Sequence, residues 1–173
     1  MSTTESNKEF KVFQILVDNN SGVLSRIAGL FTRRGYNIDS ITAGTTADPR
    51  FTRITIVTSG DHDIIEQIEK QLRKLEDVRD IKRLREGKSV YRELMMIKVR
   101  ANSQQRESIT AVVNIFRASI VDVGKDSLTI MLTGDQSKLD ALIGLLDDYE
   151  ILELARTGVT GLSRGADDVR YFN

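Results

Sequence analysis

Residues 18–26 have the residue types best suited to binding a small polar ligand. They join a β-rich run to a run with helical spacing, which places Gly22 and Val23 at the N-terminus of a helix. The unpaired amides of a helix N-terminus bind carboxylates, and Gly22 has no Cβ to obstruct a ligand. The Asn19 amide both donates and accepts hydrogen bonds, as recognition of an ammonium-plus-carboxylate ligand requires. The same residues also fit an Asx-rich turn that only caps the helix, so both interpretations stay open at this point.

Catalytic and metal-binding chemistry has few candidates in this chain. There is no cysteine, and His62 is the only histidine, which excludes thiolate sites and histidine clusters. His62 lies between Asp61 and Asp63 at the start of an expected exposed helix, where a solvated side chain is the simpler interpretation. No Gly-x-Gly-x-x-Gly, phosphate-loop or His-Glu-x-x-His pattern is present. These patterns indicate no catalytic residue, no metal site and no cofactor in the chain itself, but paired acid–base carboxylates stay open, since nothing in the sequence selects a pair.

Composition and charge exclude further classes of protein. The 173 residues include 25 Lys+Arg and 25 Asp+Glu, so the net charge is zero and offers no basic footprint for nucleic acid or an anionic membrane. The longest apolar runs, such as residues 94–97, fall far short of the roughly 18 residues of a membrane span. The N-terminal residues lack a basic or apolar leader. We expect a cytoplasmic protein without nucleic-acid or membrane partners.

The elements that must position the 18–26 segment follow a recognisable order. Periodicity and turn residues predict strands over residues 10–17, 38–46, 51–59 and 78–84, and helices starting near Val23 and after Asp61. Gly35 is placed to end the first helix in a left-handed conformation, and Asp61 to cap the second. The order β-α-β-β-α-β predicts a ferredoxin-like α+β domain.

The second half repeats this order. Apolar spacing predicts strands over residues 94–101, 120–123, 128–133 and 151–154, with helices around Ile109 and Leu139. The fold class is therefore α+β with two ferredoxin-like βαββαβ domains. The expected division is a polar N-terminal tail (1–9), a first domain (10–85), a linker (86–92), a second domain (93–165) and a C-terminal tail (166–173).

The same fold occurs in RNA-binding proteins and in acylphosphatase-type enzymes, and the sequence disfavours both. RNA-recognition domains display aromatic side chains on their central strands, whereas the expected strand over residues 51–59 has no aromatic residue after Phe51. An acylphosphatase-type enzyme needs an anion-cradling loop with a partner asparagine, and no such Gly-Arg constellation lies near the first helix.

Residues 18–42 resemble an ACT domain, and more narrowly the regulatory small subunit of acetolactate synthase, also called acetohydroxyacid synthase. Residues 66–75, 115–123 and 156–165 agree with the same family in the same order, so the resemblance covers nearly the whole chain. It implies that the first domain is an ACT domain and that the chain is a non-catalytic subunit.

The resemblance also implies partners and a regulatory role. The family's large subunit binds thiamine diphosphate, Mg²⁺ and FAD and condenses pyruvate with pyruvate or 2-oxobutyrate in branched-chain amino-acid biosynthesis. The small subunit raises that activity and confers feedback inhibition by valine, in some members by leucine or isoleucine. Family ACT domains form homodimers side by side, with the effector at the interface. The alternative is a stand-alone amino-acid-sensing ACT protein that acts on another partner.

The family's effector contacts map onto two groups of residues. Asn19, Gly22 and Val23 would hold the carboxylate and ammonium from one protomer, while Asn37 and Ile38 would approach from the other. Leu24 and Ile41 are our own candidates for apolar contacts, and Gly44 matches a small residue near the interface. Gly22 and Asn37 flank opposite ends of one helix, so we hypothesise that the site is shared between two protomers.

Overall fold

The computed structural model describes residues 9–166, so the expected tails lie outside this range except for Glu9 and Ala166. The chain folds as two compact units. Of the described residues, the first unit contains 9–90 and 159–166, and the second is Tyr91–Gly158. Both have the order β-α-β-β-α-β, which confirms the predicted α+β class with two ferredoxin-like domains.

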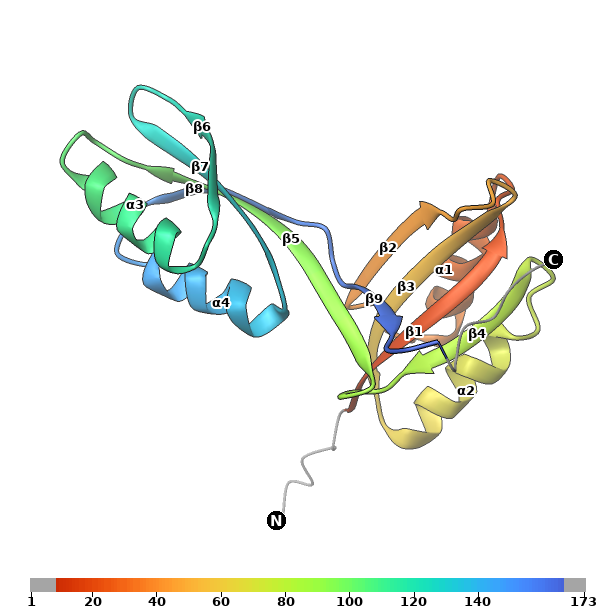
Figure 1. Ribbon diagram of the computed structural model, residues 1–173. Helices are drawn as coiled ribbons and strands as arrows, with labels where there is room; N and C mark the ends of the chain where they lie inside the picture. The colour runs from red at the N-terminus through yellow and green to blue at the C-terminus, as the bar shows by residue number, and fades with distance from the viewer. Residues whose placement is uncertain (1–8, 167–173) are drawn as a thin grey trace, which may run out of the picture. The chain divides into compact units, whose positions relative to one another are not determined.

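The first unit is an antiparallel sheet with two helices on one face (Figure 1). Its elements are β1 (Glu9–Asp18), α1 (Val23–Arg34), β2 (Ser40–Thr45), β3 (Phe51–Gly60), α2 (His62–Leu72) and β4 (Val78–Leu84). The strand order β2-β3-β1-β4 places β2 at one edge of the sheet. Two local predictions are confirmed: Gly35 ends α1 with φ of 66°, and the Asp61 carboxylate accepts a hydrogen bond from the Ile64 amide at 2.8 Å.

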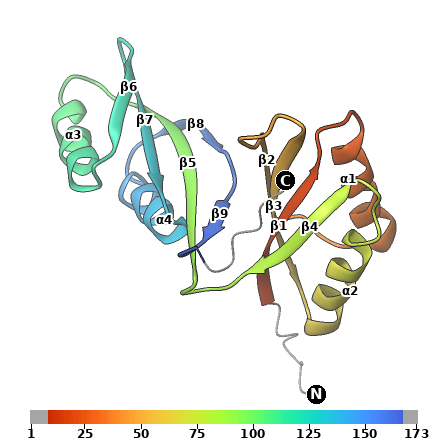
Figure 2. The same ribbon diagram turned by 45° about the vertical axis from the view of Figure 1, so that its right-hand side comes forward.

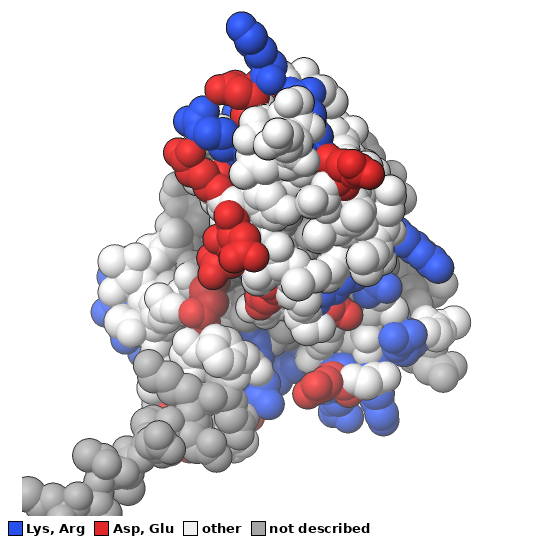
Figure 3. Space-filling model, turned by 90° about the vertical axis from the view of Figure 1, so that its left-hand side faces the viewer, with Lys and Arg blue, Asp and Glu red and all other residues white. Residues whose placement is uncertain are grey.

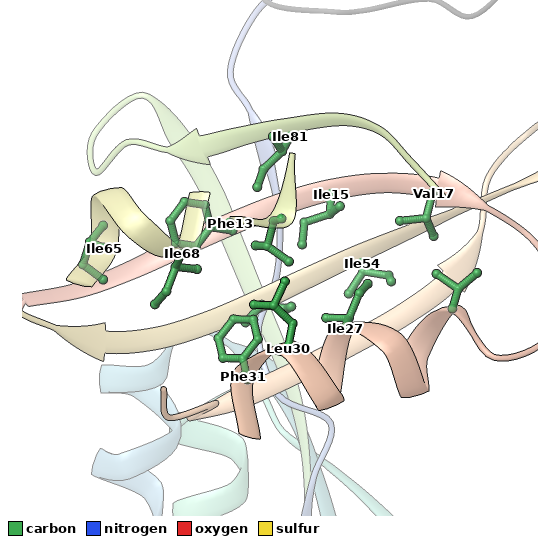
Figure 4. Close-up of a cluster of buried hydrophobic side chains, with 13 residues drawn as sticks. Phe13, Ile15, Val17, Ile27, Leu30, Phe31, Ile54, Ile65, Ile68 and Ile81 are labelled. Carbon is green, nitrogen blue, oxygen red and sulfur yellow. The ribbon is translucent and has the colours of Figure 1, made fainter. Parts of the chain in front are cut away.

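The core of the first unit lies between its sheet and its helices. Phe13 and Ile15 alternate with Gln14 along β1, so the apolar side chains face the helices and the amide faces away. They pack against Ile27 of α1 and Ile68 of α2, all fully buried (Figure 4). This packing fixes both ends of α1 against the sheet, and with them the segments that carry the candidate binding residues.

The second unit has the same construction. Its elements are β5 (Ser89–Arg100), α3 (Gln105–Ile115), β6 (Ser119–Val123), β7 (Ser127–Gly134), α4 (Gln136–Leu145) and β8 (Ile151–Arg156). The strands run in the order β6-β7-β5-β8, and α3 and α4 cover one face of the sheet (Figures 1 and 2). Met95, Ile97 and Val99 of β5 form the centre of its core with Ile109 and Leu139.

Two segments differ from the boundaries that the sequence predicts. The expected linker over residues 86–92 is a strand from Ser89 onward, because β5 begins within the first unit. The expected second domain reached residue 165, but the chain from Val159 lies with the first unit and forms β9 (Thr160–Ser163) there. A hydrogen bond holds this segment on the first unit, where the Gly161 carbonyl accepts from the buried Gln14 side chain at 2.7 Å. A membrane-crossing helix would have to be longer and more apolar than any found within residues 9–166.

Candidate functional site

The N-terminus of α1 differs from those of the other described helices. Gly22 precedes the helix in a left-handed conformation, with φ of 84°, and no side chain bonds to the first amides of α1. In contrast, Asp61, Asn102 and Asp135 accept hydrogen bonds from the first-turn amides of α2, α3 and α4. The first turn of α1 also contains no acidic residue. Its amides and the positive end of its dipole are therefore available to an anion.

Arg26 adds a positive charge beside this helix end. Its Nη1 atom lies 3.0 Å from the position that a Cβ on Gly22 would occupy. The Nε and Nη2 atoms donate to the carboxylate of Asp77 at 2.6 and 2.9 Å, and this interaction raises the pKa of Arg26. A cation at a helix N-terminus is unfavourable by itself, so Asp77 is needed to hold Arg26 there.

A second ion pair braces the strand that leads into the junction. The Arg79 Nε atom of β4 donates to the Asp18 carboxylate at 2.7 Å, and the Arg79 Nη2 atom makes a further contact with it. The hydrogen bonds from Arg79 hold the pKa of the Asp18 carboxyl below its usual range. The Asp18 amide also donates to the Asp77 carbonyl at 3.0 Å. The end of β1 is thus tied to the start of β4 and to the Arg26 partner.

Asn19 holds the turn between β2 and β3. Its backbone amide donates to the Arg50 carbonyl at 2.8 Å, and its side-chain Nδ2 donates to the Pro49 carbonyl at 2.9 Å. Its Oδ1 accepts from the Thr52 hydroxyl at 3.1 Å. Both functions of the amide therefore have partners within the chain, and Asn19 positions this turn beside the N-terminus of α1.

Asn37 and Ile38 lie beyond the other end of α1. The exposed Asn37 side chain donates from Nδ2 to the Asp39 carboxylate at 2.6 Å, while its carbonyl accepts from the Thr58 hydroxyl at 2.6 Å. Ile38 is half-buried and packs against the core of the first unit. The hydrogen bond from Thr58 fixes the backbone here and leaves the Asn37 amide at the surface.

The remaining candidates lie along the open edge of the sheet or on α1. Ile41 pairs with Ile56 and thus faces the helix side of β2, with 38% of its side chain exposed. Gly44 pairs with Arg53 on the opposite face, and a Cβ added there would meet no atom within 4 Å. Leu24 is exposed on α1, whereas the Val23 side chain is buried and offers only its backbone.

The structure brings these residues together as two groups, not one. Asn19, Gly22, Val23 and Leu24 lie at the N-terminal end of α1, near the end of β2 that contains Gly44. Asn37 and Ile38 lie at the other end. The 12 residues of α1 span about 18 Å, which is too far for one small amino acid to bridge.

Arg26 and Asp77 were not singled out from the sequence. Arg26 follows Gly22 by four residues, and this spacing places the two on one helix face. The sequence could therefore have identified Arg26 as a neighbour of Gly22. Asp77 has no such signal, because it approaches from the turn before β4, 51 residues along the chain.

Other chemistry has little support in the described part of the chain. Residues 9–166 contain no group of three His, Cys, Asp or Glu side chains placed to hold a metal ion. Basic side chains are scattered among acidic and uncharged ones on the face shown in Figure 3.

Comparisons with known proteins agree with the geometry. A family profile described as an AHAS small subunit-like ACT domain matches residues 13–80, and one described as the small subunit of acetolactate synthase matches residues 92–165. The probable acetolactate synthase small subunit of Methanothermobacter thermautotrophicus is 48% identical over 94% of this chain and 97% of its own length. The isozyme 3 small subunit of Escherichia coli is 46% identical over 90% of this chain and 96% of its own.

A solved structure gives the same result. The crystal structure of the acetolactate synthase small subunit from Thermotoga maritima superposes with a TM-score of 0.85 at 39% identity, over 91% of this chain and 99% of that one. The first unit is therefore an ACT domain. The chain belongs to the family of acetolactate synthase small subunits. This membership confirms the expectation that the chain is a subunit and not an enzyme by itself.

Proposed function

We propose that this chain regulates acetolactate synthase in branched-chain amino-acid biosynthesis. In this proposal it raises the activity of the catalytic subunit and confers feedback inhibition by valine, with leucine and isoleucine as further candidate effectors. Thiamine diphosphate, Mg²⁺ and FAD would be held by the catalytic subunit, and the complex would act in the cytoplasm.

The observation that carries the proposal is the uncapped N-terminus of α1 beside the open edge of β2. The first amides of α1 lack a side-chain acceptor, and Gly22 leaves the backbone accessible. An amino-acid carboxylate supplies the acceptor that the helix lacks. The Arg26 guanidinium is neutralised as a pair by Asp77, but its Nη1 atom lies beside Gly22 and can donate a further hydrogen bond there.

Pairing of two ACT domains through β2 accounts for the separation of the candidate residues. Within residues 9–166, β2 is an edge strand with neighbours on one side only. If two copies pair antiparallel through β2, the Thr45 end of one strand lies beside the Ser40 end of the other. The six residues of β2 span about 20 Å, close to the length of α1. Asn37 of one copy would then lie near Gly22 of its partner.

Binding of L-valine to the purified chain is the first test, with D-valine as the control. Isothermal titration should give saturable heat for L-valine only, because a carboxylate and an ammonium fixed at α1 would point the D side chain elsewhere. Addition of the chain to a catalytic subunit should then raise synthase activity, and L-valine should lower it again. Valine binding without any effect on synthase activity would favour the stand-alone sensor instead.

Asn37→Ala tests whether the site is shared. The substitution lies about 18 Å from the helix end where the carboxylate would bind. A shared site predicts that valine affinity falls about tenfold or more, whereas a site within one chain predicts no change. Thr32→Ala, on the exposed face of the same helix, is the matched control and should bind valine as the parent does. Equal affinity for Asn37→Ala and the parent would contradict the shared site.

A further inference from the structure

Residues 159–164, which we name the strap, return from the second unit and cross the sheet of the first. The Thr42 hydroxyl of β2 donates to the Val159 carbonyl at 2.9 Å, and the Gln14 side chain of β1 donates to the Gly161 carbonyl at 2.7 Å. Farther along, the Arg164 amide donates to the Lys88 carbonyl at 2.9 Å. The strand within the strap, β9, lies beside β4 and pairs with β5 (Figure 1).

The strap covers the face of the sheet that no helix covers. Thr42, Thr55 and Gln14 are paired neighbours across β2, β3 and β1, and their side chains point away from α1 and α2. Gln14 and Thr55 are each only 2% exposed, although they are polar and lie opposite the helical layer. Among residues 9–166, the buried Gln14 amide bonds through its Nε2 atom to the strap, while its Oε1 atom has no partner. A buried amide without a partner is destabilising, so the strap is an integral part of this domain.

The strand β2 connects the strap to the proposed effector site. Ser40 and Thr42 point toward the strap, where the Val159 amide also approaches the Ser40 hydroxyl at 3.4 Å. Ile41 points to the other face, toward α1. β2 is an edge strand with most of its residues exposed, and it is hydrogen-bonded to β3 and to the strap. A shift of β2 would therefore change its bonds to Val159.

The residues just before Gly158 are also held by hydrogen bonds and an ion pair, in this case to β5 of the second unit. The Thr157 amide donates to the Leu94 carbonyl at 3.0 Å, and the Thr157 hydroxyl accepts from the Leu94 amide at 3.1 Å. One residue earlier, Arg156 forms a two-pronged ion pair with the buried Glu93, at 3.0 and 2.8 Å. Gly158, with φ of 86°, is the one residue between Thr157 and Val159. Gly158 thus separates Thr157, which is bonded within the second unit, from Val159, which is bonded within the first.

We propose that Thr42 and the strap transmit effector binding from β2 to the second unit. Thr42 is a positioning residue in this proposal, which rests on the proposed function: it binds no effector, and it holds Val159 in the place that the effector-bound β2 requires. An effector shifts the activity of the complex only through a difference in free energy between two arrangements. The bonds from Ser40 and Thr42 to Val159 are the contacts that distinguish those arrangements.

Thr42→Val tests this role, because valine keeps the β-branched shape and removes only the hydroxyl. Thr42→Ser restores the hydroxyl and serves as the rescue variant. Thr160→Val, an exposed position within the strap, is the matched control. Each variant is examined as the full chain for L-valine binding by calorimetry, and in complex with the catalytic subunit for inhibition by L-valine.

The proposal predicts that Thr42→Val binds L-valine within about threefold of the parent chain, while half-inhibition of the complex needs at least about fivefold more L-valine. Thr42→Ser and Thr160→Val should behave as the parent. Hydrogen exchange at the amides of Gly161 and Leu162 should slow on valine binding in the parent but not in Thr42→Val. A merely structural role for Thr42 would lower the melting temperature and leave both valine responses intact.

The outcomes separate the two proposals. If the parent binds L-valine and Thr42→Val is inhibited at the same concentration as the parent, the strap does not transmit the effect and only this inference is overturned. If the parent binds no L-valine, the effector site itself is overturned, and transmission through the strap falls with it.

Discussion

The junctions before α1 and α3 occupy the same place in two copies of one fold. They differ in whether a side chain of the chain itself caps the helix. In both, a backbone amide at the end of the preceding strand donates to the neighbouring hairpin: Asn19 to the Arg50 carbonyl and Ala101 to the Asp126 carbonyl, each at 2.8 Å. Before α3 the chain caps itself, since the Asn102 side chain accepts from the Gln105 amide at 2.9 Å.

The cap before α3 is reciprocal. The Gln105 side chain accepts from the Asn102 amide at 3.1 Å, which completes a capping box. At the first junction Gly22 occupies the position before the helix, and no side chain replaces the missing acceptor. The hairpin bond is common to both units, whereas the side-chain cap is missing only at the first of these two junctions. The missing side-chain acceptor is thus the feature that distinguishes the proposed effector site from the matching junction of the second unit.

Of the substitutions at the two junctions, we expect Gly22→Ala to have the largest effect on valine affinity. Alanine in the left-handed region costs about 1 kcal/mol, and its Cβ would lie 3.0 Å from the Arg26 Nη1 atom. We expect valine affinity to fall about tenfold or more, measured by calorimetry, with a lower melting temperature. Gln104→Ala, at the matching place before α3 where the backbone is right-handed, should change neither quantity appreciably. Unchanged valine affinity in Gly22→Ala would show that the effector does not approach this backbone.

Asn102→Ala removes the side-chain cap of α3 and tests the comparison at the second junction. Removal of the cap leaves the amides of Gln104 and Gln105, at the start of α3, without this acceptor and should lower the free energy of unfolding by about 1 kcal/mol. Valine binding should not change, because this junction lies in the other unit. Chemical denaturation and calorimetry measure the two effects, and Ser103→Ala is the exposed control next to it. A loss of valine affinity in Asn102→Ala would place an effector contact in the second unit.

Acid should affect the first junction in a predictable direction, with the smallest effect of the three. The pKa of Asp18 is lowered by its hydrogen bonds with Arg79, so the folded state favours the charged carboxylate. The resulting stabilisation is present above the carboxyl's ordinary pKa and is lost as the pH falls through the lowered value. Asp18→Asn should therefore lose less stability than the parent when the pH drops below about 4. Equal pH profiles in denaturation experiments would mean that this ion pair contributes nothing measurable.

Several parts of the fold follow from local sequence alone. The strand over residues 78–84 has the predicted bounds, Gly35 ends α1, and the Asp61 carboxylate caps α2. These features depend on residues within a few positions of one another, where apolar periodicity and side-chain bonds to nearby amides determine the structure. The two repeats of β-α-β-β-α-β were predictable for the same reason.

The candidate site was predictable only in part. Gly22 and the helix N-terminus are local features, and the sequence indicates both. The partners of Asn19 are not local, because Pro49 and Thr52 reach it through the pairing of β1 with β3. For this reason the amide that the sequence suggests as a ligand contact has both of its functions bonded within the chain.

The sequence by itself determined the fold class, the two repeats, the start of a helix after Gly22 and the family. Each depends on periodicity, turn residues or a motif that is contiguous in the chain. Only the tertiary structure decided that Asp77 holds Arg26 beside that helix end, that β5 begins where a linker was expected, and that the strap returns to the first unit. Those contacts join residues from 51 to 147 positions apart. Their geometry follows from strand pairing and from the need to satisfy buried polar groups such as the Gln14 amide, which no local pattern encodes.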